Sequence, residues 1–271
     1  MKTAMDLDSS EAITLLISYG FNPNIMIDNQ NIADYLISTG HENLSLPLIS
    51  SGLDPNLLVN GDSESILYWA VLEKNEELIK KIISSGGNVN FIKRSKNISV
   101  IDLAIRLLPD SYLKYFIKDD TDLSIKNKKN SSYLMIALQN KKIETAIKLV
   151  KSSAYLEKEF LHEDFLLKIV MYWTEGSEQV ADILLNKDNK INEHLPLYQE
   201  AIKNLNINAV KWLLGHGFSP YSEYIDEYQW YGYNAFNEID LMRKKLRSID
   251  LDPHEKDQKI LDEIESIISN P

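Results

Sequence analysis

The stretch IISSGGNVN, residues 82–90, joins the apolar end of a predicted helix to a turn of small residues, and it decides the fold because it recurs. The copies are LLISYGFNPN at 15–24, LISSGLDPN at 48–56 and WLLGHGFSP at 212–220, with weaker ones ending at Asp120, Ser153 and Asp188. Turn positions 20, 52, 86, 120, 153, 188 and 217 are 32, 34, 34, 33, 35 and 29 residues apart, a mean of about 33. A fixed period of this length indicates a stack of similar units.

Each unit is predicted to contain two helices. In the unit that ends at residue 90, the apolar positions of the second helix recur at i, i+1, i+4 and i+5, and they are Leu78, Ile79, Ile82 and Ile83. Charged residues occupy the opposite face, which is typical of an amphipathic helix. One helical hairpin cannot bury both of its faces, so neighbouring hairpins must stack and share a core. The sequence therefore predicts an all-α solenoid.

The repeats resemble a known family. SILYWAV at 65–71 and GGNVN at 86–90 match without a gap the ankyrin pattern, which begins with Thr-Pro-Leu-His-Leu-Ala-Ala and closes with Gly-Ala-Asp-Val-Asn. Gly40 and His41 fall on the Gly-His of that pattern. The chain is thus similar to ankyrin repeat proteins over nearly its whole length, in about seven to eight divergent units. The resemblance implies an ankyrin-type helical-hairpin solenoid that recognises another protein through its hairpin tips and inner groove.

The family pattern is eroded at two kinds of position. No unit keeps Thr-Pro at the start of its first helix, where Ser65, Ser99 and Ser132 stand in for threonine. The glycine that closes a unit, present at 20, 52, 86 and 217, is replaced at 120, 153 and 188. We expect each glycine to adopt the left-handed conformation that ends a helix.

The predicted organisation is a single domain, residues 1–271. Residues 1–24 form an N-terminal half repeat in which only the helix at 11–19 is recognisable, residues 25–221 hold the internal repeats, and residues 222–271 hold an aromatic finger and a C-terminal capping helix pair. Asp252, Pro253 and Glu255 are typical of a helix start. The last helix then runs to about Ser269, with an inner stripe of Ile260, Ile264 and Ile267 or Ile268.

Composition narrows the function classes. The 271 residues include 40 acidic and 29 basic side chains, a formal charge of −11, and no cysteine. Disulfides, thiol nucleophiles and cysteine zinc sites are excluded, and a reducing, cytoplasmic location is favoured. An acidic chain is poorly suited to phosphate backbones, so we expect no nucleic-acid partner and a protein partner with a basic surface. No signal peptide and no membrane span are predicted.

No catalytic or metal-binding pattern is apparent in the sequence. The five histidines, at 41, 162, 194, 216 and 254, lie in different units and lack metal-ligand spacing. Phosphate loops and nucleophile elbows are also missing. We therefore predict that the protein is not an enzyme and needs no cofactor or metal. The rival hypothesis is an enzyme with its site in the divergent residues 162–173.

One segment is unusually aromatic and acidic. YSEYIDEYQWYGY, residues 221–233, contains five of the 14 tyrosines and lies where the repeat pattern places a projecting hairpin. The candidate binding residues in it are Tyr221, Glu223, Tyr224, Asp226, Glu227, Tyr228, Trp230, Tyr231 and Tyr233. Tyrosine and tryptophan dominate interaction hot spots, and about −6 of the net charge lies after residue 217, so the segment is predicted to bind a basic partner. The alternative is that these rings pack over the C-terminal cap.

The resemblance to ankyrin repeats implies further groove residues, which are Asp62, Glu64, Leu72, Glu73, Arg106, Thr174, Glu175, Lys203 and Asn204. Trp173 stands where the family has a small alanine, so it either overfills the helix junction or emerges onto the inner surface. Trp69 and Trp212 occupy apolar helix positions and are predicted to be buried.

The function predicted from these features is non-enzymatic protein recognition by a protein that is monomeric when free. The residue usage, rich in Lys, Ile and Asn, and the lack of cysteine favour a bacterial source. In that setting the protein could be an immunity protein that covers the active site of a toxin domain. The alternatives are an effector that docks on a host protein and an acidic mimic of nucleic acid.

Overall fold

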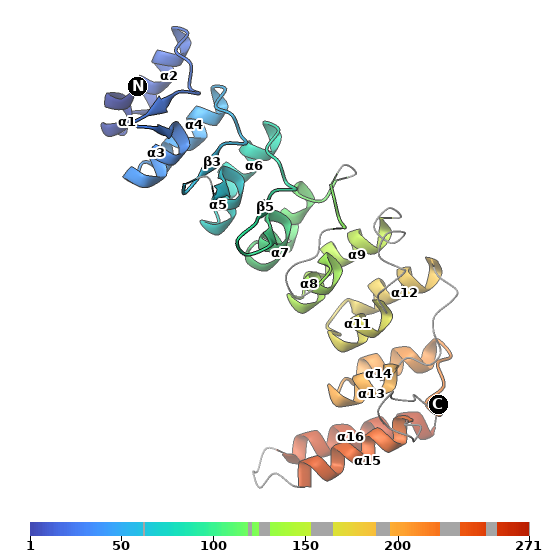
Figure 1. The fold of residues 1–271 in the computed structure, drawn as a ribbon. Helices are drawn as coiled ribbons and strands as arrows, with labels where there is room; N and C mark the ends of the chain where they lie inside the picture. Colours follow the sequence, from blue (N-terminus) through green and yellow to red (C-terminus); the bar gives the residue numbers. More distant parts are fainter. Residues whose placement is uncertain are drawn as a thin grey trace. The chain divides into compact units, whose positions relative to one another are not determined.

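The computed structural model describes residues 1–61, 63–118, 121–124, 131–152, 165–187, 196–222, 234–247 and 254–270. These residues are mostly helical, as predicted, and the strands among them are short (Figure 1). Contacts between Cα atoms divide the chain into two compact units, Met1–Thr145 and Ala146–Pro271. The predicted finger residues 223–233 lie outside the described residues, as do the turn positions Asp120, Ser153 and Asp188.

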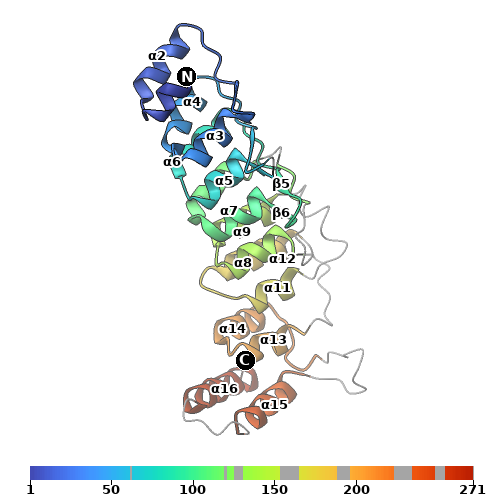
Figure 2. The same ribbon diagram turned by 60° about the vertical axis from the view of Figure 1, so that its left-hand side comes forward.

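The first unit is built from paired helices. Its helices are α1 (Lys2–Asp6), α2 (Ser10–Ser18), α3 (Ile32–Thr39), α4 (Ser45–Ser50), α5 (Ile66–Leu72), α6 (Glu76–Ser84), α7 (Val100–Leu107), α8 (Tyr133–Gln139) and the start of α9 (Ile143–Lys151). Two 3-10 helices, η1 (Glu42–Leu44) and η2 (Asp110–Tyr115), complete it. The first helices pack in the row α5, α7, α8, and the second helices in the row α2, α4, α6 (Figures 1 and 2).

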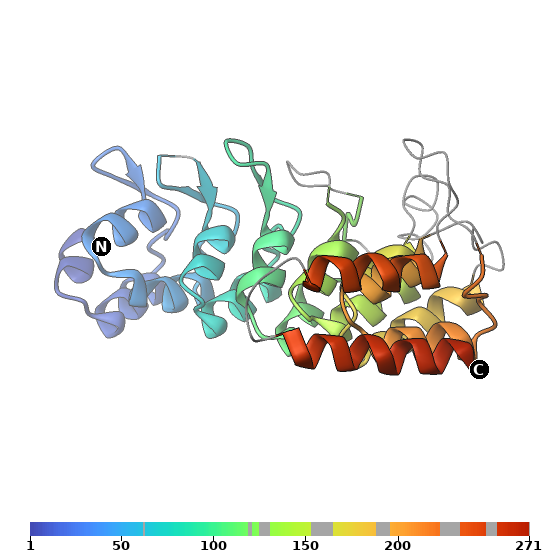
Figure 3. The ribbon, with the colours of Figure 1, turned by 90° about the horizontal axis from the view of Figure 1, so that it is seen from below.

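Short antiparallel hairpins lead into three of the first helices. Their strands are β1 (Met26–Ile27) with β2 (Gln30–Asn31), β3 (Leu58–Val59) with β4 (Glu64–Ser65), and β5 (Ile92–Lys93) with β6 (Ile98–Ser99). Figure 3 shows these hairpins projecting from one side of the helices of this unit. Each hairpin ends at a capping residue, because the side chains of Asn31, Ser65 and Ser99 accept hydrogen bonds from the amides of the helices that follow.

The core of the first unit depends on small and apolar residues at recurring positions. Ala70, Ala104 and Ala137, on α5, α7 and α8, are completely buried and let the first helices approach closely. The predicted apolar face of α6, including Leu78 and Ile82, is also buried. Trp69 is only 7% exposed, as predicted.

The second unit repeats the pairing. Its helices are the rest of α9, then α11 (Phe165–Met171), α12 (Ser177–Lys187), α13 (Leu197–Lys203), α14 (Ile207–Gly215), α15 (Ala235–Arg247) and α16 (His254–Ser269). Helix α13 packs between α11 and α15, while α14 packs against α16, and α15 and α16 form the final helix pair (Figure 2). Trp212 on α14 is buried, at 8% exposure, as predicted.

Backbone conformation confirms the predicted spacing. The turn between the two helices of a pair contains a residue with positive φ at Asp8, Gly40, Lys74, Lys141, Gly176 and Leu205. The intervals are 32, 34, 67, 35 and 29 residues, and 67 equals two steps of 34 and 33. The closing glycines at 20, 52, 86 and 217 also have positive φ, as expected. The pair of α7 and η2 has no such residue, because Leu108 is extended and Pro109 starts a 3-10 helix instead.

Two local expectations were wrong. The N-terminal segment is not a half repeat, since the five-residue helix α1 precedes α2 and packs on it through Met5, which is fully buried. Its short length and polar sequence hide the helical pattern. In α16 the fully buried stripe is Leu261, Ile264 and Ile268, whereas Ile260 is half-buried, because the face that meets α14 and α15 is one residue further round the helix.

Candidate partner-binding surfaces

Two predicted groove residues of the first unit are exposed on neighbouring first helices. Glu73 follows α5 directly, and Arg106 lies in the last turn of α7, against which α5 packs. The Nε of Arg106 lies 2.5 Å from a carboxylate oxygen of Asp102, which is 2% exposed and is held by the capping residue Ser99. Asp102 therefore fixes an arginine at the surface. Asp62 lies outside the described residues.

Glu64, expected to line the groove, is instead 6% exposed and structural. Its carboxylate bonds the Nζ of Lys93 on the next hairpin and accepts a hydrogen bond from the side chain of Asn60, 2.8 Å away. The Nζ of Lys93 lies 5.6 Å from the centre of the Tyr68 ring. This pair could not be recognised from the sequence, because the two residues are 29 positions apart and belong to different repeats.

In the second unit Trp173 lies in the turn between α11 and α12 and is half-buried. Its ring centre is 5.6 Å from that of Trp212, so it covers the neighbouring α14 rather than overfilling the helix junction. The side-chain amide of Asn206 bonds the Trp173 carbonyl at 3.3 Å, which fixes this turn to the next helix pair. Glu175, two residues further along the same turn, is exposed.

An aromatic and acidic cluster that the sequence did not reveal surrounds Trp212. The Trp212 indole donates a hydrogen bond to Asp182 at 2.8 Å, and its ring is stacked on His216 at 4.2 Å. The Nε2 of His216 lies 3.2 Å from the same carboxylate. The Phe218 ring also stacks on Trp212, with 6.1 Å between the ring centres. Trp212 and His216 lie 30 and 34 residues after Asp182. Both intervals are close to the repeat length, so the spacing could have suggested these contacts.

Among the candidate binding residues of the finger, Tyr221 alone lies within the described part of the chain. It is 62% exposed, and its ring stacks on Phe236 with 5.3 Å between centres. Phe236 belongs to the first turn of α15, where the Asn234 side chain accepts the amides of Phe236 and Asn237. Asn234 therefore caps the start of α15, and Tyr221 packs its ring on the cap while most of its surface faces solvent.

A buried carboxylate lies between α13 and α15. Glu238 is 4% exposed, and its Oε1 has no hydrogen-bond partner. Burial raises the pKa of this carboxyl, and nearby Glu200 adds to the rise, while Lys203 and Lys245 oppose it. The arrangement costs stability when Glu238 is ionised, because its charge is removed from water without full compensation.

Two further features are absent from the described residues. No group of three or more His, Asp or Glu side chains among them could hold a metal ion. Within the same residues, no helix is long and apolar enough to cross a membrane. The rival site at 162–173 is described only from residue 165 onward, and there it contributes the packed helix α11 and Trp173.

Comparison with known proteins adds no family. No protein-family model matches the chain, and a search of curated proteins finds no significant match.

Proposed function

We propose that this protein is a non-enzymatic recognition module of the ankyrin repeat type, which holds a partner protein on the surface formed by its hairpins and first helices. The supporting observation is the recurrence of helix pairs linked by side chains that bond from one pair to the next. Examples are Asn31 to the carbonyl of Leu58 at 2.6 Å and Tyr133 to Ser99 at 2.8 Å. Such links pre-organise a surface, which lowers the entropy cost of binding.

The proposed partner has a basic surface. In the sequence, the acidic and aromatic residues 221–233 follow α14 and precede α15. Tyr221, at the start of this segment, is exposed. Exposed Glu175, half-buried Asp182 and the half-buried ring of Trp173 add carboxylates and an aromatic face in the same unit. Cationic side chains bind well to such a combination. The specific role we propose is that of an immunity protein that neutralises a toxin enzyme by covering its active site.

The test is a pull-down from the source organism with the wild-type protein and the double variant Tyr228→Ala/Trp230→Ala. We expect the double variant to lose the main partner while its helicity and melting temperature change little. A matched control is Tyr19→Ala, because Tyr19 is 85% exposed in the first unit and lies far along the sequence from the finger. Equal recovery of the partner by all three proteins would contradict the proposal.

A further inference from the structure

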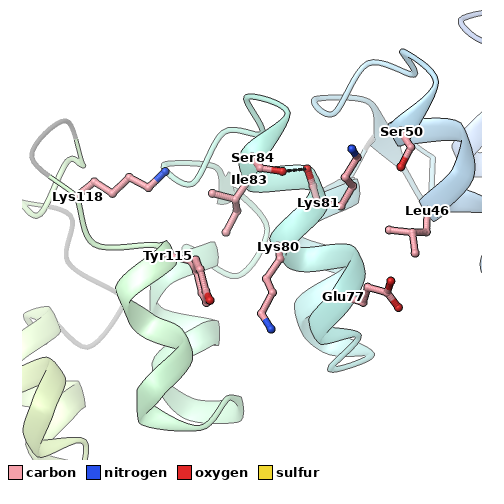
Figure 4. A pocket seen from close by; sticks show the side chains of 9 residues that line it. All are labelled: Leu46, Ser50, Glu77, Lys80, Lys81, Ile83, Ser84, Tyr115 and Lys118. Carbon is pink, nitrogen blue, oxygen red and sulfur yellow. Dashed lines mark hydrogen bonds between the residues drawn. The ribbon is translucent and has the colours of Figure 1, made fainter.

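A hollow of about 480 Å³ lies on the side of the first unit that its second helices form. Its lining is mainly basic, whereas the finger is acidic. Its lining comes from three consecutive helix pairs: Leu46, Ser50, Glu77, Lys80, Lys81, Ile83, Ser84, Tyr115 and Lys118 (Figure 4). The volume is within the range of sites that hold a small molecule or a short peptide segment.

Helix α6 forms the middle of the hollow. It has nine residues, with α4 on one side and the six-residue 3-10 helix η2 on the other. Five residues of α6 line the hollow: Glu77, Lys80, Lys81, Ile83 and Ser84.

The rim is cationic in an acidic protein. Three lysines and one glutamate line the hollow, although the whole chain carries −11. Within the described part of the chain, no ion pair to a carboxylate engages Lys80, Lys81 or Lys118. Among those residues, no carboxylate within salt-bridge distance neutralises their charges.

One of these lysines is already oriented. The Nζ of Lys80 hydrogen-bonds the Tyr112 hydroxyl at 3.1 Å and lies 4.6 Å from the centre of that ring and 5.8 Å from the centre of Tyr115. Lys114 lies 5.3 Å from the Tyr115 ring centre and adds a further cation beside the hollow. Apolar surface between the charges comes from Leu46 and Ile83.

From this pattern we infer that the hollow is a second docking site, which takes an acidic peptide segment of a partner protein. Carboxylates of the segment pair with Lys80, Lys81 and Lys118, while an apolar side chain rests on Leu46 and the Tyr115 ring. Charge complementarity selects this occupant, since the lysines would repel the basic surface proposed for the finger's partner. The two sites therefore select partners of opposite charge.

The probe is a fluorescein-labelled peptide, Glu-Leu-Glu-Glu-Leu-Glu, titrated with the full chain and followed by fluorescence anisotropy in low salt. Lys81→Glu/Lys118→Glu reverses the charges of half-buried Lys81 and exposed Lys118 on the rim, and we expect it to weaken binding at least about tenfold. The matched control Lys96→Glu/Lys148→Glu makes the same charge change at two exposed lysines outside the hollow and should leave affinity within about twofold.

Other outcomes overturn the inference. They are absence of binding by the wild type, equal loss in both double variants, and equal binding of the Gln-Leu-Gln-Gln-Leu-Gln peptide. Competition by inorganic phosphate at the same concentration as the acidic peptide would identify a simple anion site instead. A dimer in sedimentation experiments that the peptide dissociates would assign the hollow to a second copy of the chain. Unchanged melting temperatures verify that each variant is folded.

Discussion

The side-chain Oδ1 of Asn56 accepts a hydrogen bond from the backbone amide of Asn88, 2.8 Å away in the next repeat. Its Nδ2 donates to the carbonyl of Gly86 at 3.2 Å. The same relation links Asn24 to Asp54 and Gly52, and Asn90 to Asp122. One amide side chain per repeat therefore satisfies backbone groups of the following turn, so the closing asparagine of the repeat pattern has a structural role.

Asn56→Ala should lower the free energy of unfolding by about 0.5–1 kcal/mol, because it removes two hydrogen bonds to exposed backbone groups of the next turn, which water then solvates. Urea denaturation followed by circular dichroism measures the change. Asn56→Asp is the matched variant, since it keeps an acceptor for the Asn88 amide and loses only the donor to Gly86. Its loss should be smaller, and equal stability of the alanine variant and the wild type would contradict the assigned role.

Glu64→Gln tests the assignment of this residue to structure rather than recognition. Loss of the charge leaves Lys93, whose side chain is 14% exposed, without its counter-ion. We expect the free energy of unfolding to fall by about 2 kcal/mol. Glu73→Gln, at an exposed position of the neighbouring helix, should change it by less than about 0.5 kcal/mol. Similar losses in both variants would argue against the buried pair.

Asp110 caps a helix of the following pair. Its carboxylate accepts hydrogen bonds from the amides of Glu144 and Thr145, at 2.8 and 3.2 Å, in the first turn of α9. Asp110→Ala should therefore cost about 1–2 kcal/mol in thermal or urea unfolding, as for other helix caps. Asp110→Asn keeps an acceptor oxygen, so its free energy of unfolding should fall less. Asp122→Asn is the control and should not reproduce the loss of the Asp110→Ala variant, because Asp122 accepts a hydrogen bond from the amide of Ser124 in a different turn.

Much of the helical pattern could be predicted because it is local. The apolar face of α6 and the capping serines at 65, 99 and 132 follow directly from residue type and spacing. The short helix α1 and the 3-10 helix η2 could not be recognised, since five or six residues are too few to show a helical period. Tertiary packing stabilises both helices, since Met5 of α1 and Leu113 of η2 are buried.

The binding surfaces were less predictable, because they depend on contacts between repeats. Arg106 and Glu175 are exposed as the resemblance implied, but the Glu64–Lys93 pair and the Asp182–His216 contact join residues about one repeat apart. The spacing of the repeats alone does not predict which side chains are in contact. The cationic hollow likewise brings together side chains from three successive repeats.

Glu238 makes stability depend on pH in an unusual direction. Because burial raises the pKa of its carboxyl in the folded protein, the folded state binds this proton more tightly than the unfolded chain does. At a pH below the ordinary value of about 4.3 both states are protonated and the residue costs nothing. As the pH rises above that value, the unfolded chain loses its proton first, so this residue lowers stability until the folded carboxyl also ionises.

Glu238→Gln removes the titration and should therefore stabilise the protein at pH 7, with the gain shrinking toward zero near pH 4. Urea unfolding of both proteins between pH 4 and pH 8 measures the difference. Glu178→Gln, at an exposed position of α12, is the control and should show no such trend. If Glu238→Gln were less stable than the wild type at pH 7, the ionised carboxylate would have to be a net stabilising group between α13 and α15.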